Sequence, residues 1–115
     1  REKNKCIKKS LRAAKIHDGK YRIAVMPSYG YPSETAAEVR KILGTEIELL
    51  VFDNGKFSIR SVPDISHLIA REFNGGGHPN ASGGNLGYGW KEKALFKIFR
   101  HVSKRKEFLS VAEKF

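Results

Sequence analysis

The chain contains a single cysteine, Cys6, among its 115 residues. One thiol cannot form an internal disulfide and has no second cysteine with which to bind zinc, so the sequence predicts neither feature. No apolar run approaches the ~18 residues of a membrane-spanning helix, and the first residues are charged, unlike those of a secretory signal. We therefore expect a cytoplasmic protein with no membrane partner.

Two common phosphate-binding motifs are also missing. No GK[ST] is present, which excludes a P-loop, and the glycine-rich segment follows a predicted helix and breaks the dinucleotide spacing at Asn80. Aspartate is scarce, since Asp18, Asp53 and Asp64 are the only three and lie far apart in the sequence. Hydrolysis assisted by two metal ions needs several converging carboxylates and histidines. We therefore expect no catalytic residue and no metal site in this chain.

Basic residues, in contrast, are abundant, with 22 Lys or Arg against 12 Asp or Glu and a net charge of +10. The excess lies at the two ends: residues 1–20 carry eight basic side chains against two acidic, and residues 91–115 carry eight against three. Such an excess attracts anions, although two solvated lysine-rich helix faces would give the same composition. A phosphate-binding groove would use it only if both ends fold near the site.

The order of helical and strand patterns predicts a compact two-layer α/β domain with a mixed β-sheet covered by helices. At 115 residues, 40% of them hydrophobic, one domain is expected. The turn at 53–55 predicts a hairpin and hence an antiparallel pair. Ser33 and Asp64 are expected to cap helices. The expected helices span residues 4–16, 34–43 and 65–73, and the expected strands span 21–26, 46–52, 56–62 and 81–86.

A further helix is expected after Trp90, because the strongest helical periodicity of the chain follows it. Its apolar positions are Ala94, Leu95, Ile98, Phe99 and Val102. We expect this helix to cover the sheet. Apolar residues at 108–115 either extend its buried side or belong to a frayed end.

The alternation along the strand at 56–62 separates two kinds of side chain. If Phe57 and Ile59 face the core, Ser58 and Arg60 project together from the opposite face. A guanidinium beside a hydroxyl suits a phosphate, because arginine offers a planar fork of donors and serine a flexible one. An exposed arginine with no ligand would give the same pattern.

The segment GGGHPN at 75–80 places a histidine in a backbone without side chains. Consecutive glycines pack nothing and cost conformational entropy, so they indicate either a tight loop or main-chain N–H groups that a ligand approaches. Pro79 fixes φ directly after His78. The sequence therefore makes this segment a candidate anion-binding loop.

Three segments, taken in order, resemble the DHHA1 domain, the substrate-binding domain of DHH-family phosphoesterases. They are FSIRS at 57–61, DISHLIAREF at 64–73 and GGGHPNASGG at 75–84. The resemblance covers about residues 21–90, and three motifs in order are more specific than glycines alone. Asn74 stands where the family commonly has a further glycine, and asparagine tolerates the left-handed region.

The resemblance implies that residues 21–115 form a substrate-binding domain and residues 1–20 a linker helix from a separate N-terminal DHH catalytic domain. That partner domain would carry manganese or magnesium. The substrate would be a short single-stranded RNA or DNA, or a cyclic dinucleotide, and a homodimer is compatible with the pattern. The residues implied to bind it are Ser58, Arg60, Gly75, Gly76, Gly77, His78 and Asn80. This chain alone is expected to be inactive.

Two other classes stay open. One is a non-catalytic RNA-binding module related to the C-terminal domain of alanyl-tRNA synthetases, whose glycine motifs usually lack the His-Pro-Asn arrangement. The other is a structural domain with basic ends.

Tyr29 and Tyr31 would either stack on bases or lie on the edge of the core.

Overall fold

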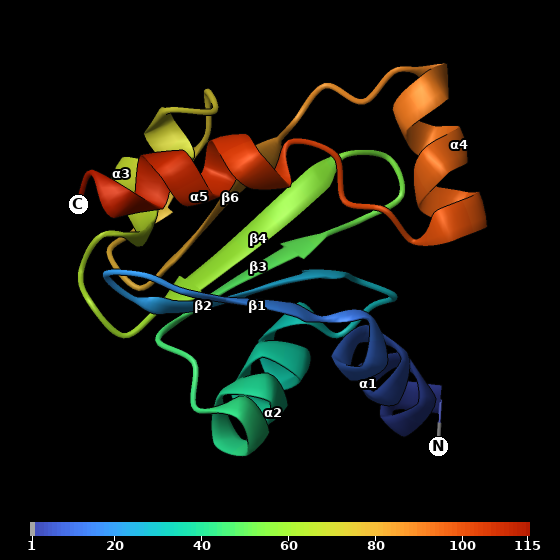
Figure 1. Ribbon diagram of the computed structural model, residues 1–115, viewed down its shortest axis with the longest axis horizontal. Coiled ribbons are helices and arrows are strands. Elements are labelled where there is room, and N and C mark those ends of the chain that lie inside the picture. The colour runs from blue at the N-terminus through green and yellow to red at the C-terminus, as the bar shows by residue number, and fades with distance from the viewer. Residues whose placement is uncertain (1) are drawn as a thin grey trace.

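The computed structural model describes residues 2–115, which form a six-stranded mixed sheet with helices on both faces (Figure 1). The strand order is β1-β2-β3-β4-β6-β5. The pair β2–β3 is parallel, and the other four pairs are antiparallel. In chain order the elements are α1 (Glu2–Ala13), β1 (Lys15–Asp18), β2 (Arg22–Pro27), α2 (Pro32–Leu43), β3 (Ile47–Val51), β4 (Lys56–Ser61), α3 (Ser66–Arg71), β5 (Gly76–His78), β6 (Ala81–Asn85), α4 (Trp90–Phe99) and α5 (Arg105–Glu113).

The predicted α/β class and the mixed sheet covered by helices are confirmed. Helix α2 crosses between the parallel strands β2 and β3, as a parallel connection requires. Strands β3 and β4 form the expected hairpin, in which Gly55 adopts a φ of 90°. Within residues 2–115, no helix is long and apolar enough to cross a membrane.

The sheet separates two hydrophobic clusters. The larger one lies on the face of α3 and α5 and includes Phe57 and Ile59 of β4, while the smaller one lies on the face of α1 and α2 and includes Leu50. Leu50 pairs with Ser58 across β3 and β4, so Ser58 shares the face of the smaller cluster. The predicted alternation along β4 is therefore confirmed.

Helix α2 is held on β3 by a buried carboxylate. Glu48 is fully buried, and Arg40 of α2 donates to it from Nε at 3.1 Å and from Nη2 at 2.7 Å. The hydroxyl of Thr45 donates a third bond at 2.7 Å. A buried charge needs such partners, because removing one leaves an uncompensated ion in the interior. The charge of Arg40 is consequently used within the fold.

The N-terminal segment differs from its prediction. The expected helix at 4–16 ends at Ala13, and residues 15–18 form the edge strand β1, which pairs with β2 from Lys15 opposite Val25 to Asp18 opposite Arg22. Leu11 of α1 packs against the smaller cluster. The segment is thus part of the sheet and its packing, and the division at residue 20 into linker and domain stays a prediction.

The C-terminal helices also differ from their prediction. Helix α4 ends at Phe99 because Arg100 takes a left-handed conformation with φ 54°. Ile98 and Phe99 are 71% and 72% exposed, and α4 stands beside the end of the sheet (Figure 1). Helix α5 covers the sheet instead, with Phe108 only 2% exposed. Helical periodicity at 94–102 was therefore a misleading guide to which helix is buried.

Both expected helix caps are wrong. Helix α2 starts at Pro32 with Tyr31 as its N-cap residue, so Ser33 lies inside the helix. Helix α3 is shorter than 65–73, and its N-cap residue is Ile65. His67 of α3 is half-buried, and its buried Nδ1 has no hydrogen-bond partner in the described chain.

Exchanging the apolar ring of each C-terminal helix for a methyl group tests this arrangement. We expect Phe108→Ala to lower the free energy of unfolding by about 3–5 kcal/mol, because it leaves a cavity in the larger cluster. Phe99→Ala, the matched control, should change it by less than about 0.5 kcal/mol because the ring is exposed. Urea unfolding followed by circular dichroism measures both, and equal losses would contradict the placement of α5.

Candidate nucleic-acid interface

The glycine segment is a strand, which corrects its prediction as a loop. Gly76–His78 form β5, which pairs with β6 through a two-residue connection, with Gly76 opposite Gly83 and His78 opposite Ala81. Strand β5 is one edge of the sheet, and its three residues are exposed. Edge strands present unpaired main-chain N–H and C=O groups. The main chain near His78 is therefore accessible, as the candidate site required.

The strand register brings the predicted side chains onto one face. Arg60 pairs with Ala81, which pairs with His78, and Ser58 pairs with Gly83, which pairs with Gly76. Neighbours in such a row point to the same side of a sheet, and two strand spacings set Arg60 and His78 about 10 Å apart at Cα. We call this surface the glycine face; it comprises Ser58, Arg60, Gly76, His78, Ala81 and Gly83.

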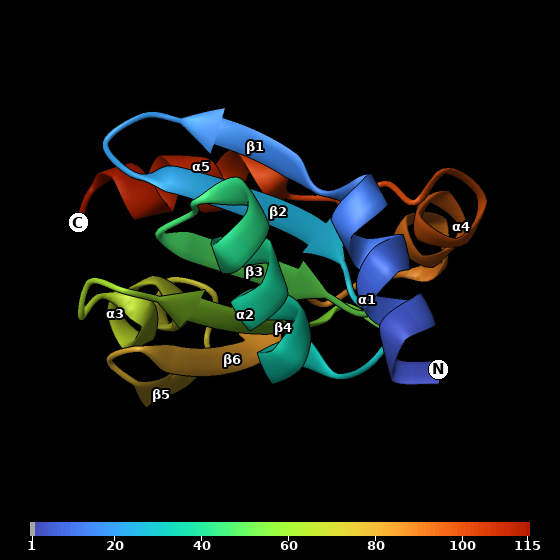
Figure 2. The ribbon, with the colours of Figure 1, turned by 90° about the horizontal axis from the view of Figure 1, so that it is seen from below.

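The glycine face lies on the same side of the sheet as α2. In Figure 2, α1 and α2 lie over β2 to β4, whereas β5 and most of β6 have no helix in front of them. Ala81, between Arg60 and His78, and Gly83, between Ser58 and Gly76, are small and half-buried. A ligand can therefore reach both Arg60 and His78 from this side.

Arg60 is held by neutral partners only. Its Nη1 donates to Ser58 Oγ at 2.8 Å, and its Nη2 donates to Ser33 Oγ at 2.8 Å. Within residues 2–115, the three ion pairs are Arg22–Asp18, Arg40–Glu48 and Lys114–Glu72, so no carboxylate neutralises this guanidinium. Each serine accepts a bond here and keeps its own O–H to donate. Donors therefore converge around an uncompensated positive charge.

A cavity of about 160 Å³ adjoins this guanidinium, between the first turns of α2 and the β5–β6 connection. It is lined by Ser33, Ala36, Ala37, Arg40, Arg60, Ser61 and Asn80. Since Glu48 binds Arg40 through two bonds, Arg60 is the free cation of the lining. Ser33 was missed as a site residue, because nothing in local spacing links it to an arginine 27 positions away.

Close packing explains some of the glycines but not Gly76. A Cβ on Gly75 would collide with the carbonyl oxygen of Gly83, and a Cβ on Gly77 would lie 2.7 Å from Ser82 Cα. A Cβ on Gly76 would meet nothing within 4 Å. Gly75 and Gly77 are thus needed for the fold, whereas the missing side chain at Gly76 only keeps the glycine face bare.

Asn80 is turned toward the fold. Its Nδ2 lies 3.1 Å from the carbonyl oxygens of Ser61 and Val62 and 2.9 Å from Asp64 Oδ1. The amide therefore ties the β5–β6 connection to the segment after β4. Asp64, expected to cap a helix, serves as one of these acceptors. Substrate binding by Asn80 stays a prediction.

Basic residues from both ends of the chain meet in one cavity that lies away from the glycine face. Lys15 and the segment around Arg105 line one cavity of about 390 Å³. Its other lining residues are His101, Val102, Lys104, Lys106 and Glu107. Lys15 belongs to β1, and β1 and β5 are opposite edges of the sheet. The basic residues of this cavity therefore do not supply the cations of the glycine face.

Metal-ligand groups are absent from the part of the chain that the structure describes. No three His, Cys, Asp or Glu side chains within residues 2–115 gather closely enough to hold an ion.

Comparisons with known proteins identify similar folds. No protein-family model and no curated protein matches the chain. An exopolyphosphatase-related protein from Bacteroides fragilis aligns with a TM-score of 0.61 and 21% identity over 95% of this chain and 36% of its own. An uncharacterized protein from Helicobacter pylori G27 aligns with a TM-score of 0.53 and 23% identity over 79% and 29%. At these identities the likeness shows the fold, and the chain spans about a third of each neighbour.

Removing the amide of Asn80 tests its anchoring role. We expect Asn80→Ala to lower the free energy of unfolding by about 1–3 kcal/mol, because acceptors after β4 lose their donor. Asn4→Ala, on the exposed face of α1, is the matched control and should leave stability within about 0.5 kcal/mol. Urea unfolding measures both, and an unchanged Asn80→Ala protein would mean that the amide does not hold the hairpin.

Proposed function

We propose that this chain is the substrate-binding domain of a DHH-family phosphoesterase that hydrolyses phosphodiester bonds in short single-stranded RNA or DNA, or in cyclic dinucleotides. The resemblance of three ordered motifs supports this assignment. The Bacteroides fragilis neighbour of the same fold is named exopolyphosphatase-related, which agrees with a phosphate-bearing substrate. A separate catalytic domain would hold manganese or magnesium.

One observation carries the proposal: Arg60 is an uncompensated guanidinium in the same row of the glycine face as the exposed His78. A cation fixed by hydroxyl oxygens and lacking a carboxylate is arranged for an anionic ligand. Arg60 and His78 lie about 10 Å apart at Cα, two strands from each other. A ligand that contacts both side chains is therefore longer than a single phosphate group.

The residues have separable roles in this proposal. Arg60 donates to phosphate oxygens, and the hydroxyls of Ser58 and Ser33 add their own protons. Gly76 keeps the main chain of β5 open to close approach. His78 donates a hydrogen bond from the edge of the sheet. The metal ions of the partner domain would polarise the phosphate and activate water.

Binding of a 5′-phosphorylated dinucleotide tests the glycine face. We expect Arg60→Ala and His78→Ala each to raise the dissociation constant at least tenfold, because one charge-assisted hydrogen bond contributes about 1.5–3 kcal/mol. Arg71→Ala is the matched control, since Arg71 is an exposed arginine of α3 on the other face. Isothermal titration at two salt concentrations measures affinity and its ionic component.

Gly76→Val separates binding from folding in the same assay. The added Cβ meets nothing within 4 Å on the exposed edge strand, so we expect the stability to hold and the dinucleotide affinity to fall. Arg60→Ala and His78→Ala without effect would reject the proposed site. Binding of transfer RNA in preference to the dinucleotide would instead favour a non-catalytic RNA-binding module.

The isolated chain should not hydrolyse its ligand. We expect no release of mononucleotides with manganese or magnesium, because residues 2–115 gather no metal-ligand cluster. Chromatography of a radiolabelled dinucleotide measures this, with a metal-dependent exonuclease as positive control. Metal-dependent release that persists through purification and is lost on one point substitution would overturn the division of roles.

A further inference from the structure

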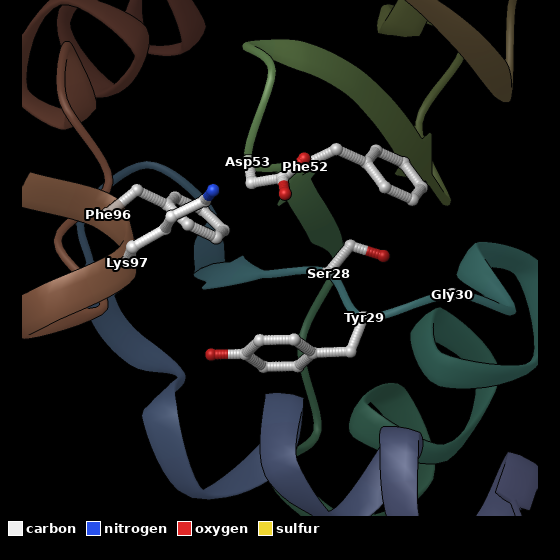
Figure 3. A pocket seen from close by; sticks show the side chains of 7 residues that line it. All are labelled: Ser28, Tyr29, Gly30, Phe52, Asp53, Phe96 and Lys97. Atoms are coloured by element: carbon white, nitrogen blue, oxygen red, sulfur yellow. The ribbon is translucent and has the colours of Figure 1, made fainter. Parts of the chain in front are cut away.

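A second cavity, of about 430 Å³, lies at the carboxyl ends of the parallel strands β2 and β3. This end of parallel strands is where α/β sheets commonly bind ligands, and the volume lies within the usual range for small-molecule sites. It shares no residue with the glycine face. Its lining residues are Ser28, Tyr29, Gly30, Phe52, Asp53, Phe96 and Lys97, shown in Figure 3.

Aromatic rings form much of the lining. Phe96 and Lys97 extend from α4, and the Tyr29 ring lies below them in the view, with its hydroxyl directed toward the α4 side (Figure 3). Lys9 Nζ stands 4.5 Å from the centre of the Tyr29 ring and so occupies one of its faces. Burial raises the pKa of Tyr29, against the lowering influence of Arg100, so its hydroxyl is neutral near pH 7. A planar ligand has apolar surfaces to lie against.

The charged side chains of the cavity do not neutralise each other directly. Asp53 and Lys97 point toward one another in Figure 3, yet they form no ion pair within 4 Å among the described residues. A polar group placed between them would accept a hydrogen bond from Lys97 and donate one to Asp53. A ligand with both functions on one edge satisfies both side chains.

Ser28 lies between the two charged sides of the cavity and the end of the sheet. Ser28 is 4% exposed, and its Oγ has no hydrogen-bond partner within residues 2–115. Its main-chain N–H donates to the carbonyl oxygen of Val51 at 2.7 Å, which fixes the residue at the end of β3. Its Oγ is buried and directed away from Asp53 and Lys97 (Figure 3), so Ser28 contributes lining surface and leaves the polar contacts to those two side chains.

The combination excludes two simple ligand classes. A lone phosphate would be repelled by Asp53, and a hydrocarbon would desolvate two charges without replacing their hydrogen bonds. A planar heterocycle with a polar edge avoids both penalties. The substrate class of the proposed function contains such a group in every nucleotide.

We propose that this cavity binds a nucleobase, and guanine in preference to the others. The O6 of guanine accepts from Lys97, its N1–H and exocyclic amino group donate to the carboxylate of Asp53, and its ring lies beside Tyr29 and Phe96. Adenine, cytosine and uracil do not present an acceptor next to two donors on one edge. This inference rests on the proposed function, which supplies nucleotides as the class of ligand.

The cavity is connected to the glycine face by one short loop. Ser28, Tyr29 and Gly30 line the cavity, and Ser33, five residues after Ser28, holds Arg60. Five residues span at most about 18 Å. A base in this cavity and a phosphate at Arg60 can therefore belong to one short oligonucleotide.

Guanosine, which has no phosphate, tests the cavity independently of the glycine face. We expect guanosine to shift the amide resonances of Tyr29 and Lys97 in a nuclear magnetic resonance titration, with weaker binding of adenosine and uridine. Asp53→Asn should weaken guanosine binding at least tenfold. It should weaken the binding of inosine by less, because inosine lacks the amino group. Glu34→Gln, an exposed acidic residue in the first turn of α2, is the matched control and should leave the affinity unchanged.

The outcomes separate this inference from the proposed function. The guanine site is rejected if guanosine does not bind, if Asp53→Asn leaves its affinity unchanged, or if another base binds more tightly. If the 5′-phosphorylated dinucleotide still binds and still depends on Arg60, the proposed function survives that result. Guanosine binding that depends on Asp53 supports the guanine site. If Arg60→Ala leaves the dinucleotide affinity unchanged in the same experiments, the phosphate site is rejected.

Discussion

The close approach of the β5–β6 hairpin to its neighbours is the constraint on which this molecule depends. Gly75 leaves room for the carbonyl oxygen of Gly83, and Gly83 would place a Cβ 2.7 Å from the carbonyl oxygen of Phe57. Main chains can approach this closely only where side chains are missing. The same absence leaves β6 and β5 bare on the face of α2. Packing and access to the main chain therefore have one cause.

Electrostatics follows from that geometry. The buried Glu48 takes the charge of Arg40, while Arg60, in the row with Glu48, finds only hydroxyl and carbonyl oxygens. An exposed ion pair would have contributed at most about 1 kcal/mol, so leaving Arg60 without one costs the fold little. The uncompensated charge instead stays available for an anionic ligand.

Patterns of period two were more informative about this protein than patterns of period 3.6. Alternation along β4 predicted that Ser58 and Arg60 share a face, because the large core fixes the position of Phe57 and Ile59. The hydrogen bond from Arg60 to Ser33 could not be predicted from the sequence, since it depends on where α2 crosses the sheet. Strand β5 was missed because two glycines and a histidine carry no strand propensity, and the strand forms through pairing with β6. Likewise, tertiary packing buried α5 rather than the more periodic α4.

The loop between β2 and α2 connects all of these features. Gly30 and Tyr31 both have positive φ, at 116° and 55°, and a left-handed conformation costs a residue such as tyrosine about 1–2 kcal/mol. The main-chain bond from Thr35 to the Tyr31 carbonyl oxygen, at 2.9 Å, and the packing of α2 against β3 offset that cost. Because the turn is sharp, Tyr29 stays beside the cavity while Ser33 reaches Arg60. Strain held at such a position is typical of segments that shape a binding surface.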